Sequence, residues 1–179
     1  MSKTEKEPVP RLFFALWPND AERTALTSWQ LPLHELCGGR VMRAETLHAT
    51  LVFLGGVGES RLEALCLAAQ EVNFQAFDLN LTEARYWGHN HIVYAAPETV
   101  PHPLAELVDR LENSLGKHRF RFDRRPYKPH VSLLRNAKWH DELLPSLPAV
   151  RWRCNEFVLV QSLSDAGSTS YRILAHFGV

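Results

Sequence analysis

The sequence has few cysteines, no long hydrophobic run and no net charge. Its three cysteines, in a chain of 179 residues, show no CxxC spacing, which disfavours both a disulfide framework and a four-cysteine zinc site. We therefore expect reduced thiols in a cytoplasmic protein. The longest apolar stretches, such as Leu12–Trp17, are too short to cross a bilayer, and the polar first residues predict no signal peptide and no membrane partner.

Several nucleotide and hydrolase motifs are also missing. The chain contains no GxxxxGK[ST], GxGxxG, GxSxG or HExxH, so a P-loop, a dinucleotide fold, a nucleophile elbow and a zinc protease helix are not indicated. His89 and His91 could form a metal pair, but they lie in a predicted turn without an acidic or cysteine companion. We therefore expect neither a cofactor nor a metal.

Positive and negative side chains balance, with 20 Lys and Arg against 20 Asp and Glu. This balance argues against a protein that binds polyanions over its whole surface, but it permits a local basic site. Six cations gather just before His130 and favour a phosphate or nucleic-acid face, although an ordinary solvated loop can have the same composition. These are Lys117, Arg119, Arg121, Arg124, Arg125 and Lys128.

The hydrophobic pattern alternates between helix and strand periods. Residues 1–10 predict a disordered tail, and residues 11–179 a single domain of ordinary globular composition, with 45% apolar residues. We expect strands over 12–17, 48–54, 77–82, 92–95, 130–134, 157–160 and 171–177. Helices are expected from Asn19 or Asp20 to about residue 31, over 59–72 and over 103–115. This mixture predicts an α+β fold with helices on one side of its sheets.

One short motif occurs twice. Residues 48–51 (HATL) and 130–133 (HVSL) share the pattern His-x-Thr/Ser-Leu. Because side chains alternate across a strand, each copy presents an imidazole and a hydroxyl on one face, while Ala49, Leu51 and Phe53 are expected to face the core. The repeat predicts two related halves that each bring one copy to a shared place.

Two imidazoles beside two hydroxyls suit phosphodiester chemistry. One histidine can take a proton from a nucleophile while the other gives a proton to the leaving oxygen, since both protonation states coexist near pH 7. The hydroxyls of Thr50 and Ser132 can hold the non-bridging oxygens, and nearby Arg43 and Arg135 can orient a phosphate. The scheme requires no metal. A histidine in a strand is, however, more often structural than catalytic.

Two longer stretches make the pattern more specific: residues 43–55 (RAETLHATLVFLG) and 125–135 (RPYKPHVSLLR). Together they resemble the 2H phosphoesterase superfamily, and within it the bacterial RNA 2′,3′-cyclic phosphodiesterase group, also called 2′-5′ RNA ligase (LigT/ThpR-like). The resemblance implies a bilobal α+β fold, with two pseudo-symmetric lobes of antiparallel sheet covered by helices and an active cleft between them.

The resemblance also implies roles for individual residues. His48 and His130 would be catalytic, and Thr50, Ser132 and Arg135 would bind the phosphate. The family usually has threonine at the position of Ser132, which keeps the hydroxyl but rotates more freely about χ1. Further substrate contacts are expected from Arg43, Tyr127 and Lys128.

The implied reaction is hydrolysis of a terminal 2′,3′-cyclic phosphate to a 2′-phosphomonoester, with His130 activating water and His48 protonating O3′. A 5′-hydroxyl in place of water would join RNA ends in a 2′-5′ bond without ATP. The expected partner is an RNA or nucleotide with a cyclic phosphate end, such as a tRNA half, and the expected state is a monomer. Two alternatives stay open: a non-catalytic RNA-binding module on the same fold, and a 2H enzyme acting on another cyclic phosphate or a 2′-5′ oligonucleotide.

Overall fold

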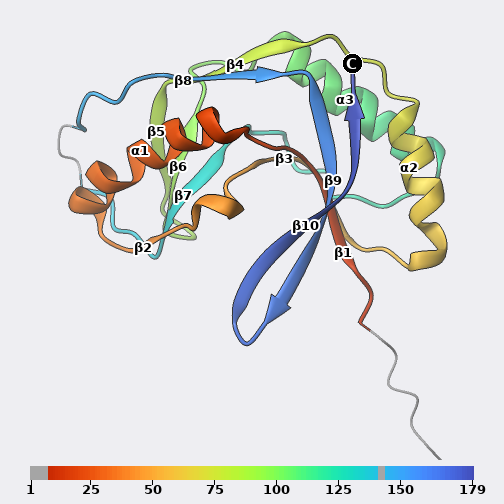
Figure 1. The fold of residues 1–179 in the computed structure, drawn as a ribbon, viewed down its shortest axis with the longest axis horizontal. Helices are drawn as coiled ribbons and strands as arrows, with labels where there is room; N and C mark the ends of the chain where they lie inside the picture. The colour runs from red at the N-terminus through yellow and green to blue at the C-terminus, as the bar shows by residue number, and fades with distance from the viewer. Residues whose placement is uncertain (1–7, 141–143) are drawn as a thin grey trace, which may run out of the picture.

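Antiparallel strands and helices are arranged in two lobes that face each other across the middle of the molecule (Figure 1). The computed structural model describes residues 8–140 and 144–179. One four-stranded sheet has the order β10-β9-β1-β3 and the other β2-β7-β6-β5, while β4 and β8 form a two-stranded sheet that joins the lobes. The α+β prediction is therefore confirmed.

The first sheet consists of β1 (Arg11–Leu16), β3 (Ala49–Gly56), β9 (Glu156–Asp165) and β10 (Ser168–Gly178). The second consists of β2 (Arg40–Val41), β5 (Glu83–Trp87), β6 (Ile92–Ala96) and β7 (Val131–Arg135). The joining sheet pairs β4 (Phe77–Leu81) with β8 (Val150–Cys154). The helices are α1 (Asp20–Cys37), α2 (Leu62–Gln70) and α3 (His102–Lys117), with the short 3₁₀ turns η1 (Ala44–Thr46) and η2 (Glu59–Arg61).

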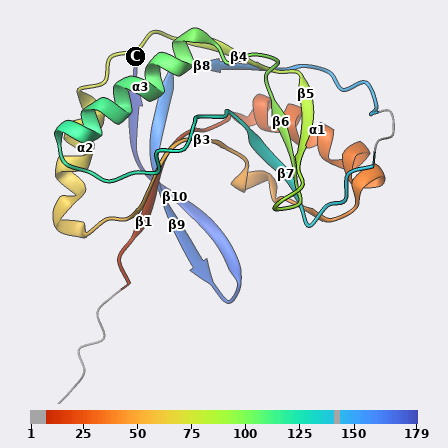
Figure 2. The ribbon, with the colours of Figure 1, turned by 180° about the vertical axis from the view of Figure 1, so that it is seen from behind.

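Two helices pack against the sheet that does not contain the strand preceding them in the chain. Helix α1 follows β1 but packs against β7 in the second sheet, whereas α3 follows β6 but packs against β3 in the first. Figure 2 shows α2 and α3 beside the first sheet and α1 behind the second. One continuous apolar core passes through both lobes.

Helix α1 starts where the sequence predicts, but it runs further. Asn19 caps it in a reciprocal capping box with Glu22. The expected end near residue 31 is wrong because Pro32 does not break the helix. Instead, Leu33 and Cys37 continue the buried face, and the helix ends at Gly38, whose positive φ of 61° suits a glycine.

Strand β8 is absent from the predicted strands, although its pattern is readable. Val150, Trp152 and Cys154 are buried and alternate with the exposed Arg151 and Arg153, which is the period of a half-buried strand. The expected strands over 77–82 and 92–95 are confirmed as β4 and β6.

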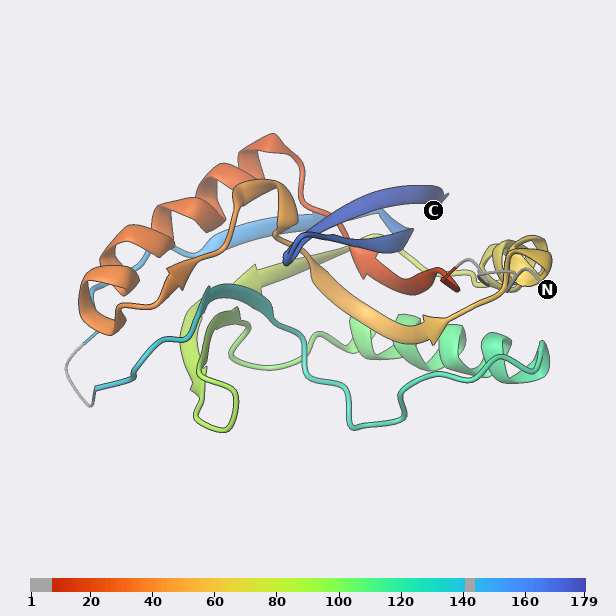
Figure 3. The ribbon, with the colours of Figure 1, turned by 90° about the horizontal axis from the view of Figure 1, so that it is seen from below.

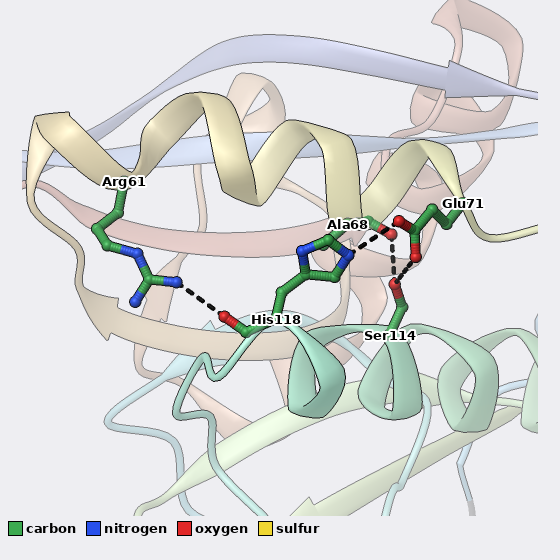
Figure 4. Close-up of polar contacts among 5 residues, drawn as sticks. All are labelled: Arg61, Ala68, Glu71, Ser114 and His118. Atoms are coloured by element: carbon green, nitrogen blue, oxygen red, sulfur yellow. Dashed lines mark hydrogen bonds and ion pairs between the residues drawn. The ribbon is translucent and has the colours of Figure 1, made fainter.

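Polar contacts connect α2 and the turn before it to the C-terminal part of α3 (Figure 4). The Ser114 hydroxyl donates to the Ala68 carbonyl over 2.6 Å, and His118 Nε2 lies 2.9 Å from a Glu71 carboxylate oxygen. Arg61 donates to the His118 carbonyl over 2.8 Å. These contacts fix the helical layer behind β3.

The expected tail of residues 1–10 lies largely outside the described residues. Within the described part, the Pro10 carbonyl accepts a hydrogen bond from the Val57 amide over 2.9 Å, so the chain is already attached to the end of β3 at that point. Over the described ranges, no helix is long and apolar enough to span a membrane.

Candidate active site

His48 lies directly before β3, and its ring is held on several sides. Its Nδ1 donates to the Thr46 carbonyl of the η1 turn over 2.7 Å, while Thr50 Oγ1 lies 3.1 Å from Nε2. The imidazole stacks on Trp17 with an interplanar angle of 11° and meets the edge of Tyr171. The carbonyl partner fixes the proton on Nδ1, which leaves Nε2 as the unprotonated base nitrogen beside the Thr50 hydroxyl.

His130 repeats this arrangement in the second lobe. It lies directly before β7, and its Nδ1 donates to the Lys128 carbonyl over 2.7 Å. The indole of Trp87 packs edge to face against the imidazole at 4.5 Å between ring centroids. In both motifs, therefore, the carbonyl two residues earlier orients the ring and leaves its Nε2 available.

Both histidines line one cavity of about 200 Å³ between the lobes. Figure 3 shows that β3 and β7 both begin near the middle of the molecule and run from there into opposite lobes, each in its own sheet. The five residues predicted to act together all line this cavity. The full set is Phe13, Met42, Thr46, His48, Thr50, Phe53, His130, Ser132, Arg135, Ser162 and Tyr171. The predicted cleft between two lobes is confirmed.

A bulge in β3 determines which side chains reach the cavity. In the pairing with β1, Thr50 and Val52 have successive partners and Leu51 has none. As a result, both Leu51 and Val52 are buried in the core, and Phe53 returns to the cavity face. The expectation that Phe53 faces the core is wrong: the residue is 36% exposed and lines the cavity.

Strand β7 has a matching bulge. Its pairing with β6 passes over Leu133, so Leu133 and Leu134 both enter the core and Arg135 comes to the same face as Ser132. The side chain of Gln30, buried on α1, donates to the Leu133 carbonyl over 3.1 Å and so satisfies the bulged backbone. Arg135 therefore occupies the position in the second motif that Phe53 occupies in the first.

Burial dominates the electrostatics of the two imidazoles. Desolvation lowers the pKa of His48 to about 4, opposed by the Thr46 carbonyl and assisted by the positive charges of His130 and Arg135. Desolvation also lowers the pKa of His130 below its usual value. Both rings are therefore mainly uncharged at neutral pH.

The remaining expected substrate contacts lie elsewhere. Arg43 lines an adjoining cavity, donates to the Thr169 carbonyl and lies 3.5 Å from Glu45. The Tyr127 hydroxyl is buried, has no hydrogen-bond partner in the described part of the chain, and does not line the histidine cavity. Lys128 contributes its backbone carbonyl to His130, while its side chain is exposed.

The basic segment before His130 does not line the histidine cavity either. Arg125 pairs with Asp123, and Arg124 lies over the ring of Phe122 at 4.6 Å. Within residues 8–140 and 144–179, no three His, Cys, Asp or Glu side chains gather in a way that could hold a metal ion.

Sequence reasoning missed several cavity residues. Phe13, Met42, Thr46, Ser162 and Tyr171 line the cavity together with the two motifs. Thr46 stands within the recognised stretch. Phe13 and Tyr171 each lie 5.0 Å from the His48 ring, between ring centroids, but they come to it only because their strands pair in one sheet. Nothing in the local sequence around Ser162 marks it.

Comparison with known proteins agrees with this geometry. The family profile described as the 2′-5′ RNA ligase superfamily matches residues 17–166. The chain belongs to this superfamily. It is similar over almost its whole length to proteins called RNA 2′,3′-cyclic phosphodiesterase: 30% identical to that of Escherichia coli, covering 94% of this chain and 96% of that protein, and 29% identical to that of Thermus thermophilus, covering 94% and 90%.

Solved structures of similar proteins have the same fold. E. coli LigT complexed with 3′-AMP matches with a TM-score of 0.84 and 30% identity, covering 97% of this chain and 99% of that chain. A structure described as a phosphoesterase matches with a TM-score of 0.85 at the same identity and coverage. The predicted 2H phosphoesterase fold is thus confirmed.

Proposed function

We propose that this superfamily member hydrolyses RNA 2′,3′-cyclic phosphate ends to 2′-phosphomonoesters. The observation that carries the proposal is one cavity lined by two histidines from different lobes, each with its Nδ1 proton bound to a carbonyl, so that each Nε2 is the unprotonated nitrogen. Relatives at about this length are called RNA 2′,3′-cyclic phosphodiesterase, and LigT of E. coli is described in complexes with 3′-AMP and with phosphate.

The reaction uses one imidazole on each side of the phosphorus. His130 Nε2 takes a proton from water as its oxygen bonds to phosphorus, and the bond from phosphorus to O3′ breaks. His48 Nε2 gives a proton to O3′, which leaves a 3′-hydroxyl and a 2′-phosphate. Each proton transfer of this kind contributes about 10²–10⁴-fold to the rate.

The protonated histidine must be generated when substrate binds. In the free protein, burial holds the pKa of His48 at about 4, so this ring is neutral near pH 7. A bound cyclic phosphate brings a negative charge beside the imidazoles, which favours the charged form and raises the pKa. Substrate binding therefore favours the protonated imidazole that the reaction needs.

The other cavity residues stabilise the phosphate and position the nucleoside. The hydroxyls of Thr50 and Ser132 donate to non-bridging oxygens, and the Arg135 guanidinium neutralises the charge that develops on them. The half-exposed ring of Phe53 supplies an aromatic surface for a base, and Arg135 can stack on the opposite face of that base.

The natural substrates we propose are RNA 3′ ends with a cyclic phosphate, including the halves of cleaved tRNA, which a monomer would meet in the cytoplasm. The same site would catalyse 2′-5′ joining of RNA ends when a 5′-hydroxyl replaces water, because only the nucleophile differs. No ATP is consumed in either direction, since the cyclic phosphate itself carries the bond energy.

A direct test measures turnover of adenosine 2′,3′-cyclic phosphate in the presence of EDTA. The wild type should produce the 2′-phosphate, and His48→Ala and His130→Ala should each lose about 10²–10⁴-fold in kcat. His102→Ala is the matched control, because His102 is exposed and pairs only with Glu106 in the described chain.

The same assay separates the alternatives. A wild type that binds but does not turn over the nucleotide would indicate a binding module. A 3′-phosphate product, or turnover restricted to 2′-5′ linkages, would indicate a different 2H reaction. Loss of activity in EDTA would contradict the proposed mechanism.

A further inference from the structure

A second cavity adjoins the histidine cavity and contains more positive charge. We propose that it binds the phosphate ester on O5′ of the terminal nucleoside, which in RNA is the diester that continues the strand. The inference rests on the proposed function. We call this space the arginine cavity; its volume is about 390 Å³, and it is lined by Arg40, Val41, Met42, Arg43, Thr46, Arg135, Ala166, Gly167, Ser168, Thr169 and Tyr171.

The two cavities are continuous. Met42, Thr46, Arg135 and Tyr171 line both of them. The histidine cavity alone is smaller than the about 300–1,000 Å³ typical of pockets that enclose a whole small molecule. A ligand whose terminal phosphate lies between the histidines therefore extends past these shared residues, and the next group along it enters the arginine cavity.

The charge of the arginine cavity follows from strand pairing. Arg40 on β2 is the direct partner of Arg135 on β7, so two guanidinium groups leave the sheet side by side. Like charges directly opposite each other destabilise a strand pair. Within the described ranges, neither arginine has an ion-pair partner, and none of the lining residues is acidic. An anion between the two side chains would remove this repulsion.

The close pairing of β2 with β7 depends on the glycine that precedes β2. Gly39 has a positive φ of 84°, and a Cβ atom there would lie 2.5 Å from the Arg135 carbonyl oxygen. Only glycine therefore allows β2 to approach β7 so closely. Arg43 adds a third cation on the same wall, although Glu45 at 3.5 Å neutralises part of its charge.

The opposite wall is polar and projects from the body of the protein. It is the end of the β9–β10 hairpin, which extends beyond β1 and reaches toward the second lobe (Figure 1, Figure 3). Ser168 and Thr169 offer hydroxyls there, and the Thr169 carbonyl holds Arg43. Arginines on one side and hydroxyls on the other are the groups that bind phosphate esters.

The structure of the substrate indicates which phosphate would enter the arginine cavity. A 2′,3′-cyclic phosphate is a 3′ end, so the rest of the RNA leaves through O5′ and its phosphate. That phosphate is the next anion along the ligand once the cyclic phosphate lies between the histidines. A 5′-phosphorylated nucleotide carries an ester at the same atom, so both sources must be tested.

The experiment compares three substrates: adenosine 2′,3′-cyclic phosphate, its 5′-phosphorylated form, and the dinucleotide ApA with a 2′,3′-cyclic phosphate end. Arg40→Ala should raise KM for the two substrates with an O5′ phosphate by about tenfold, the effect of one charge-assisted contact. It should change kcat little, and KM for the substrate without that phosphate should change less than about twofold. Arg172→Ala is the control, since Arg172 is exposed on the same hairpin but does not line either cavity.

Equal effects of Arg40→Ala on all three substrates, or no effect on any, would overturn the inference. An effect confined to the 5′-phosphorylated nucleotide would exclude the RNA strand as the ligand. Titration of the dinucleotide into the inactive His48→Ala variant, with and without Arg40→Ala, measures binding independently of turnover. A wild type that turns over none of the substrates refutes the proposed function, whereas this titration still tests the arginine cavity.

Discussion

The strand that carries His48 and the strand that carries His130 follow one plan and differ at its last position. Each has a histidine oriented by the carbonyl two residues earlier, then a hydroxyl, then a bulge. The side chain that returns to the cavity after the bulge is Phe53 in one and Arg135 in the other. In the proposed mechanism the repeated part acts on the phosphate from both sides, and the final position supplies an apolar ring in one strand and a positive charge in the other.

The largest expected effect distinguishes the acid role proposed for His48 from the base role proposed for His130. If His48 protonates O3′, a phosphodiester with a p-nitrophenolate leaving group does not need it. His48→Ala should then recover most of the wild-type rate on that substrate, whereas His130→Ala should stay about 10²-fold or more below it. Steady-state kinetics on activated and natural substrates measure this, and recovery by His130→Ala instead would exchange the two roles.

The next effect distinguishes Arg135 from Phe53. Arg135→Gln should lower kcat/KM by about 10–100-fold, with a lower kcat and a higher KM, since the lost charge stabilises both the bound phosphate and the transition state. Phe53→Leu should raise KM by about tenfold with little change in kcat, because stacking is worth about 1–3 kcal/mol per base. Equal splits between kcat and KM for the two variants would contradict this division.

The pH dependence tests the coupling of the two histidines. One imidazole must be protonated, and burial lowers the pKa of both, to about 4 for His48. We therefore expect the maximum of kcat/KM to lie above about pH 4 and below the ordinary titration range of histidine, and kcat/KM to fall about tenfold per pH unit on the alkaline side as the catalytic proton is lost. The fall in kcat should begin at higher pH, because bound phosphate raises the pKa. A kcat/KM that is constant up to pH 8 would contradict the proposal.

NMR titration of His48 without substrate compares the influence of Arg135 and Phe53 on the pKa of this histidine. The charge of Arg135 lowers the pKa of His48, so Arg135→Gln should raise it. Phe53→Leu removes no charge and should leave the titration of His48 closer to that of the wild type.

The smallest expected effect concerns the two hydroxyls. Thr50 has a β-branched side chain with a restricted χ1, whereas Ser132 rotates more freely. Ser132→Thr should therefore raise kcat by no more than about twofold to threefold, while Ser132→Ala should lower it by about tenfold, the loss of one hydrogen bond to a charged group. A Ser132→Ala variant with wild-type kcat would remove this hydroxyl from the site.

Much of the architecture could be predicted from short-range patterns. The alternation in β4 and the spacing of apolar residues in α3 predict both elements correctly. The predicted helix ends before Pro32, whereas the observed α1 continues through it. The buried contacts of Leu33 and Cys37 outweigh the backbone hydrogen bond that the proline removes. The packing of the partly buried Tyr127 against the core is equally hidden from local patterns, since that core is built from residues of the whole chain.

The sequence by itself determined the chemistry: two copies of His-x-Thr/Ser-Leu, the hydroxyl at each, and a basic residue after the second. These features follow from side-chain identity and from the two-residue period of a strand. Only the tertiary structure decided which side chains share the cavity. The bulges in β3 and β7 turn Phe53 and Arg135 inward, and the pairing of β2 with β7 places Arg40 beside Arg135. Register depends on contacts between residues far apart in the chain, which no local pattern records.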